Sequence, residues 1–94
     1  MKDERFLEIA RAVADTTRFE ILSRIARAGE LGCANLVQDL SVTPATISHH
    51  IKELNDAGLV EGRKDGKFHF YKVNSSAWSE YLKELARRVP AEKA

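Results

Sequence analysis

The segment between Val42 and Gly58 is the feature that most constrains how this chain can fold. Thr43 can accept a hydrogen bond from the first turn of a helix, and Pro44 suits the first helical position because its missing N–H would have no partner there. Gly58 can end the helix. Inside the segment, apolar residues recur at the i, i+4, i+7 spacing of one helix face: Ile47, Ile51 and Leu54. The segment therefore predicts a capped helix with one narrow buried stripe.

The opposite face of this predicted helix is polar. At about 100° per residue it carries Ala45, His49, Lys52 and Asp56, with Thr46, Ser48 and Glu53 on its flanks. The N-terminal half of this face has only small or hydrogen-bonding side chains. Such a surface can come close to another molecule.

The flanking segments extend the helix into a larger motif. Upstream, residues 33–40 predict two turns of helix joined to the next helix by a short connector, which is a helix-turn-helix. Downstream, residues 59–64 and 67–73 read as two strands. Asp65 and Gly66 between them predict a hairpin with a type I′ turn, in which both central residues have positive φ. A helix-turn-helix followed by a hairpin is a winged helix.

The rest of the chain predicts three more helices around this motif. The first begins with Asp3 as its cap and runs to about Ala14, and the second begins at Asp15 or Thr16 and ends at Gly29. The last is capped at residues 75–76 and stops before Pro90. The inward residues expected on the second helix are Phe19, Leu22, Ile25 and Ala26. The predicted fold is a single mainly α domain over residues 1–94, with four helices, a small β-hairpin and a fifth helix.

Two stretches carry a resemblance to a known family. Residues 42–60 followed by 63–71 resemble the ArsR family of prokaryotic winged-helix repressors, and residues 12–22 resemble the opening of that family's second helix. The resemblance spans roughly residues 6–73. It implies a homodimer that binds operator DNA and represses transcription by occluding the promoter.

Under this interpretation the predicted helix enters the major groove and the hairpin follows the DNA backbone. The expected DNA contacts are Thr43, Ala45, Thr46, Ser48, His49 and Lys52 of the helix, with Arg63, Lys64 and Lys67 of the hairpin. Direct readout should be modest, because the first three turns lack Arg, Asn and Gln. A dimer would bind an inverted repeat with half-site centres about one helical turn, or a multiple, apart.

Charge gives DNA binding little support, because the net charge is +1 for the chain and also +1 for residues 41–72. A basic surface must therefore be produced by folding. The two terminal helices carry continuous apolar stripes that suggest a dimer interface. Its expected residues are Phe6, Ile9, Val13, Trp78, Tyr81, Leu82 and Leu85. The alternative is that these stripes only complete the core of one chain.

No metal or other cofactor is expected. The family's thiolate pattern aligns with residues 30–36, but Gly32 and Ala34 occupy its two ligand positions and Cys33 falls between them. A site shared across a dimer, using Cys33 with His49 or His50, stays open. Cys33 is otherwise a small packed residue or a redox switch. His50 is expected to be partly buried and bonded to a neighbour, and His69 to face solvent or a cross-strand neighbour.

Other classes of protein find less support. Ser48 beside His49 is no catalytic pair, since adjacent helical side chains diverge by about 100°, so an enzyme is not expected. No apolar run approaches the ~20 residues of a membrane span, the N-terminal residues have no apolar signal region, and one cysteine allows no intrachain disulfide, so we expect a cytoplasmic protein. Two alternatives remain: a winged-helix protein-interaction module that does not bind DNA, and a redox or ligand sensor that uses Cys33.

Overall fold

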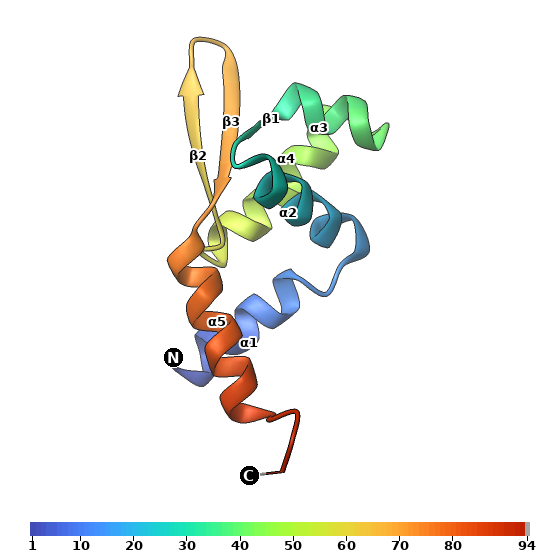
Figure 1. The fold of residues 1–94 in the computed structure, drawn as a ribbon. Helices are drawn as coiled ribbons and strands as arrows, with labels where there is room; N and C mark the ends of the chain where they lie inside the picture. Colours follow the sequence, from blue (N-terminus) through green and yellow to red (C-terminus); the bar gives the residue numbers. More distant parts are fainter. Residues whose placement is uncertain (94) are drawn as a thin grey trace.

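The computed structural model describes residues 1–93, and within them it contains five helices and one three-stranded sheet (Figure 1). The elements are α1 (Asp3–Ala12), α2 (Thr16–Ala28), β1 (Leu31–Gly32), α3 (Cys33–Leu40), α4 (Pro44–Asp56), β2 (Val60–Asp65), β3 (Phe68–Val73) and α5 (Ser75–Arg88). The winged helix-turn-helix is confirmed. Helices α1 and α5 lie together at one end of the molecule, and the β2–β3 hairpin extends from the other end (Figure 1).

Side-chain caps fix where α2 and α4 begin. Thr43 Oγ1 accepts a hydrogen bond from the Thr46 N–H at 3.2 Å, and Asp15 accepts one from the Arg18 N–H at 2.8 Å. The Thr43 cap was predicted, and of the two predicted starts of the second helix the structure has Asp15 as the cap and Thr16 as the first helical residue. Because α4 is held at its first turn and ends at Asp56 before Ala57 and Gly58, its outward face has a defined direction.

Helix α3 begins at Cys33 as predicted, but the starts of α1 and α5 differ from the prediction. Asp3 does not cap α1; it is the first helical residue, where a negative charge complements the helix dipole, and the helix ends at Ala12 instead of Ala14. Helix α5 is capped by Asn74, whose side chain accepts from the Ala77 N–H at 3.2 Å, so residues 75–76 lie in the first turn. Asn is as good a cap as Ser, and here it stands one residue earlier.

The sheet contains one strand that the sequence did not predict. Its order is β1-β3-β2, with both pairs antiparallel, and Leu31 and Gly32 of β1 pair with Tyr71 and Phe70 of β3. A two-residue strand is too short to show alternation, so it carries no pattern of its own.

The hairpin turn lies one residue later than predicted. Asp65 pairs with Phe68, so the two turn residues are Gly66 and Lys67. Gly66 has φ +61° and Lys67 has no positive φ, whereas a type I′ turn needs positive φ at both positions. The observed φ signs fit a type II′ turn, which places Gly first.

The core forms where the five helices meet the base of the hairpin. Ile47, Ile51 and Leu54 are buried, as predicted. On α2 the buried residues are Ile21, Leu22 and Ile25, and the prediction for Phe19 and Ala26 is wrong, since both are exposed. Leu22 belongs to two overlapping apolar stripes on α2, and the one with the two isoleucines faces the core.

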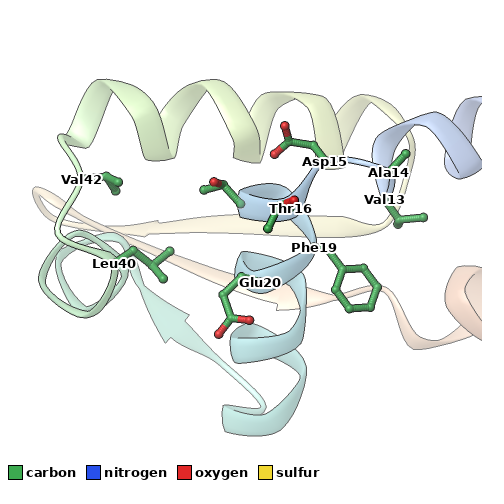
Figure 2. A pocket seen from close by; sticks show the side chains of 9 residues that line it. Val13, Ala14, Asp15, Thr16, Phe19, Glu20, Leu40 and Val42 are labelled. Atoms are coloured by element: carbon green, nitrogen blue, oxygen red, sulfur yellow. The ribbon is translucent and has the colours of Figure 1, made fainter.

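The close-up in Figure 2 shows Phe19 pointing away from the α2 axis, beside an open groove. Its side chain is 50% exposed.

No helix within residues 1–93 is long and apolar enough to cross a membrane.

Candidate nucleic-acid interface

The outward face of α4 is exposed along its length, as the sequence predicted. Ala45, Ser48, His49 and Lys52 all lie on it. This face points outward because the apolar stripe on the opposite side of α4 packs against the core. The face is therefore rigidly presented by a capped helix.

Two threonines at the start of this face are already hydrogen bonded. Thr43 Oγ1 caps the helix, and it lies 3.0 Å from the Thr46 hydroxyl. A hydroxyl has one donor and two acceptor positions, so each threonine keeps part of its hydrogen-bonding capacity. The less committed side chains on this face are Ser48 and His49, with Ala45 between the threonines as a small apolar contact.

Lys52 is engaged with its own helix. Its Nζ lies 2.8 Å from Asp56 Oδ2, one turn further on, and this pairing raises the pKa of Lys52. Both side chains are more than half exposed, so the pair is weak and a DNA phosphate can compete with it.

Arg63 of the hairpin pairs with an acidic residue of this chain, and its predicted contact with DNA stays a prediction. Its Nε and Nη2 donate to the two carboxylate oxygens of Glu30 at 2.9 and 2.7 Å. The guanidinium also lies over the Phe70 ring, 4.5 Å from the centroid. The pKa of Glu30 is lowered, first by its hydrogen bonds with Arg63. Arg63 is therefore committed to the body of the protein.

Glu30 was not expected to matter at this site. No local spacing could identify it, because it lies 33 residues from Arg63 and meets that residue only through strand pairing. With Arg63 engaged, the cations toward the tip of the hairpin are Lys64 and Lys67, which are both exposed. The Lys67 ammonium lies 5.6 Å from the Phe68 ring centroid.

His50 lies behind the outward face, as predicted. Its side chain is largely buried, but its Nδ1 makes no hydrogen bond within residues 1–93, so the predicted bond to a neighbour is absent. The nearest acid is Asp15, with Oδ2 at 4.0 Å. The pKa of Asp15 is lowered, and the largest cause is the hydrogen bond that its carboxylate accepts from the Arg18 N–H. His69 is exposed, in agreement with its predicted position.

Cys33 begins α3 and is half-buried next to Tyr71. Burial, with a smaller contribution from Cys33, raises the pKa of the Tyr71 hydroxyl to about 12. Within residues 1–93, no three His, Cys, Asp or Glu side chains gather as metal ligands would. The role of Cys33 in sensing stays a prediction.

An open groove of about 570 Å³ lies beside the helix-turn-helix (Figure 2). Its acidic residues are already engaged: Asp15 caps α2, and Glu20 binds Arg24 Nε at 2.9 Å. The apolar wall consists of Val13, Phe19, Leu40 and Val42. The groove thus offers apolar surface beside two engaged carboxylates.

The predicted dimer residues divide into three groups by burial. Phe6, Ile9 and Tyr81 lie in the core of this chain, where the Phe6 and Tyr81 rings are 5.3 Å apart, so they are not free to contact a partner. Val13 and Trp78 are half-buried. Leu82 and Leu85 are 46% and 39% exposed. The interpretation that the stripes complete the monomer core is correct for the first group.

Comparison with known proteins agrees with this architecture. Residues 13–63 match the family described as a helix-turn-helix domain. The chain is 35% identical over 77 residues to an arsenical resistance operon repressor of Staphylococcus aureus, covering 82% of this chain and 73% of the relative.

Two solved structures are similar as well. An ArsR-like transcriptional regulator from Rhodococcus sp. RHA1 superposes with a TM-score of 0.79 at 27% identity, covering 89% of this chain and 78% of that one. A homodimeric winged helix-turn-helix DNA-binding domain from Mycobacterium bovis, described as a possible ArsR-family regulator, has a TM-score of 0.75 at 21% identity, covering 98% and 92%. With the helix-turn-helix match and the repressor relative, they show that this chain belongs to the ArsR family of winged-helix transcriptional regulators, which are not enzymes.

Proposed function

We propose that this protein is a homodimer that binds an operator sequence-specifically and represses transcription by covering it. The observation that carries the proposal is the outward face of α4, where Ala45, Ser48 and His49 are exposed on a helix capped and packed from behind. In a helix-turn-helix, this is the surface that meets base edges in the major groove. The hairpin then brings Lys64 and Lys67 toward the DNA backbone.

Exposed apolar surface on the terminal helices supports the dimer. Leu82 and Leu85 share one face of α5 and are 46% and 39% exposed, Val89 just after the helix is 72% exposed, and Leu7 of α1 is 49% exposed. A second copy would remove this surface from water, and a two-fold pair would present two α4 helices to an inverted repeat. The M. bovis domain with this fold is homodimeric.

The polar side chains on α4 support modest base readout. Ser48 and His49 can bond bases or phosphates, and Ala45 can contact a thymine methyl group. Bidentate readers such as Arg, Asn and Gln are missing from the first three turns of α4. We therefore expect part of the specificity to come from DNA shape and from the spacing of two half-sites.

A DNA selection from genomic fragments, read at two salt concentrations, tests the proposal. We expect enrichment of an inverted repeat, with affinity that falls as salt rises because lysines displace counterions. The double variant Lys64→Gln, Lys67→Gln should reduce the slope of log affinity against log salt by about 0.9 for each DNA phosphate that a subunit no longer neutralises. Lys83→Gln, an exposed lysine on α5, is the matched control and should leave the slope unchanged.

The protein-interaction module is the competing function, and one observation favours it. Two of the predicted DNA-binding cations, Lys52 and Arg63, are paired with carboxylates of this chain. If no sequence is enriched and the lysine variants leave the affinity for DNA unchanged, the DNA-binding proposal is wrong. Direction of regulation would follow from transcription of the genes beside an enriched site, where repression predicts more transcript when the protein is absent.

A further inference from the structure

We propose that Arg63 and Glu30 form a clamp that fixes the direction of the β2–β3 hairpin, so that Arg63 serves DNA binding as a positioning residue and not as a phosphate contact. This inference rests on the proposed DNA binding and assigns roles within that interface. In this proposal Arg63 orients the hairpin, whereas Lys64 and Lys67 contact the DNA.

The clamp is built on one row of the sheet. Gly32 of β1 pairs with Phe70 of β3, and Phe70 pairs with Arg63 of β2, so the three residues lie side by side across all three strands. Gly32 has no side chain, and a Cβ there would lie 3.4 Å from the Phe70 ring. The Arg63 side chain crosses above Phe70, 4.5 Å from its centroid, toward the β1 side of the sheet.

Glu30 receives the guanidinium on that side. It lies just before β1, and it accepts both hydrogen bonds in a bidentate pair. Lys72 of β3 also contributes to the lowered pKa of Glu30, after Arg63. Glu30 lies in the connection between α2 and β1, and its carboxylate thus links this connection to β2 through Arg63, with Lys72 of β3 as a further nearby cation.

The clamp occupies the place where the hairpin leaves the core. Val60 and Tyr71 at its base are buried, whereas residues 61–69 are all exposed. Beyond the Arg63–Phe70 pair, the backbone of residues 64–69 pairs within the hairpin's own ladder, and a groove lies between this part of the hairpin and the start of α3 (Figure 1). A connection between β2 and the start of β1 at this point therefore sets the direction in which Lys64 and Lys67 project.

Exposed ion pairs are usually weak, and both partners here are partly exposed, with side chains 54% and 32% accessible. The arrangement differs from an ordinary surface pair because its geometry is bidentate and the guanidinium is stacked on an aromatic ring. Its effect is expected on the orientation of the hairpin more than on global stability. Lys cannot reproduce the fork geometry, which makes Arg63→Lys an informative change.

Binding to the selected DNA with Glu30→Gln and Arg63→Lys tests the clamp. Removing the negative charge of Glu30 should tighten DNA binding if only electrostatics matters, but breaking the clamp should weaken it, and we expect a several-fold loss of affinity. Arg63→Lys keeps the charge and should cause a similar loss, with the salt slope unchanged. Because both changes break one interaction, the double variant should lose no more affinity than either single variant.

Glu61→Gln is the matched control. Glu61 is exposed on β2, two residues before Arg63 and on the same face of the sheet, and it pairs across the ladder with Lys72. Removing its charge should leave DNA affinity equal or higher. Hydrogen exchange of the free proteins gives a second readout, in which Glu30→Gln should raise exchange of the hairpin amides and Glu61→Gln should not.

The clamp is wrong if Glu30→Gln binds DNA as tightly as the unchanged protein or more tightly with hairpin exchange unaltered. It is also wrong if Arg63→Gln lowers the salt slope as Lys64→Gln does, since that would make Arg63 a phosphate contact. If the unchanged protein enriches no DNA at all, the proposed function fails, and hydrogen exchange still decides whether the clamp holds the hairpin.

Discussion

Glu84 on α5 is held by two arginines of its own helix. Hydrogen bonds from Arg87 first, and then Arg88, lower the pKa of Glu84 from 4.5 to about 2. The folded state therefore favours the ionised carboxylate, so its contribution to the free energy of unfolding is complete above about pH 4.5 and disappears as the pH falls toward 2. We expect Glu84→Gln to flatten the decline of thermal stability across that window.

Melting temperatures measured between pH 2 and 6 check this expectation. Glu80→Gln, one turn earlier on the exposed side of α5, is the control and should keep the decline of the unchanged protein. Arg88 also bonds Asp3 at 2.8 Å and stacks on Phe6, so these contacts between α5 and α1 remain in the Glu84 variant. Equal pH profiles for Glu84→Gln and the unchanged protein would contradict the assigned role.

Among the elements, α4 could be predicted well from the sequence because its signals are local. The Thr43 cap, the stripe through Ile47 and Ile51 and the stop at Gly58 all act within a few residues, and the structure contains each. Strand β1 could not be predicted, because Leu31 and Gly32 become a strand only by pairing with β3. The choice between the two stripes of α2 is also made by tertiary packing.

The hairpin was predicted in part: its two strands were expected, but its turn lies one residue later. The role of this turn can be tested. Gly66 has φ +61°, a conformation that costs other residues about 1–2 kcal/mol. We expect Gly66→Ala to lower the free energy of unfolding by about that amount in urea titrations. Gly66→Ala should also weaken DNA binding, because a distorted turn would change the direction in which Lys64 and Lys67 project.

Gly62→Ala in the same hairpin is the control. Gly62 has no positive φ, and a Cβ there would meet the Tyr71 ring at 3.5 Å, an ordinary contact. Its effect on stability should be the smaller of the two. If Gly66→Ala is as stable as Gly62→Ala, the turn does not require glycine, and the type II′ geometry is not what fixes the hairpin.

For the whole molecule, the sequence could predict which face of α4 is exposed but not the state of each side chain at the candidate interface. The α4 face was predicted from periodicity alone. The pairing of Lys52 depends on its side-chain rotamer, and the pairing of Arg63 depends on how the strands of the sheet are arranged, and periodicity predicts neither. The terminal helices show the same limit. Their apolar stripes are real, but Phe6, Ile9 and Tyr81 turn into the core while Leu82 and Leu85 remain outside.

The proposed dimer depends on that outer group, and Leu85→Lys tests it. In a two-fold interface one substitution acts twice, and losing the burial of two leucines at roughly 1.5 kcal/mol each should raise the dimer dissociation constant about a hundredfold or more. Sedimentation over a concentration series measures that shift. Loss of the dimer should also remove the preference for an inverted repeat over a single half-site.

Glu80→Lys places the same new side chain on the opposite side of α5, where the helix is exposed and polar. It should leave the dissociation constant unchanged, which separates a disrupted interface from a general effect of added charge. If Leu85→Lys sediments like the unchanged protein while remaining folded, the exposed face of α5 is not where two copies meet. Recognition of an inverted repeat would then require two α4 helices to be joined through another surface, of which the apolar groove beside Phe19 is the nearest in character.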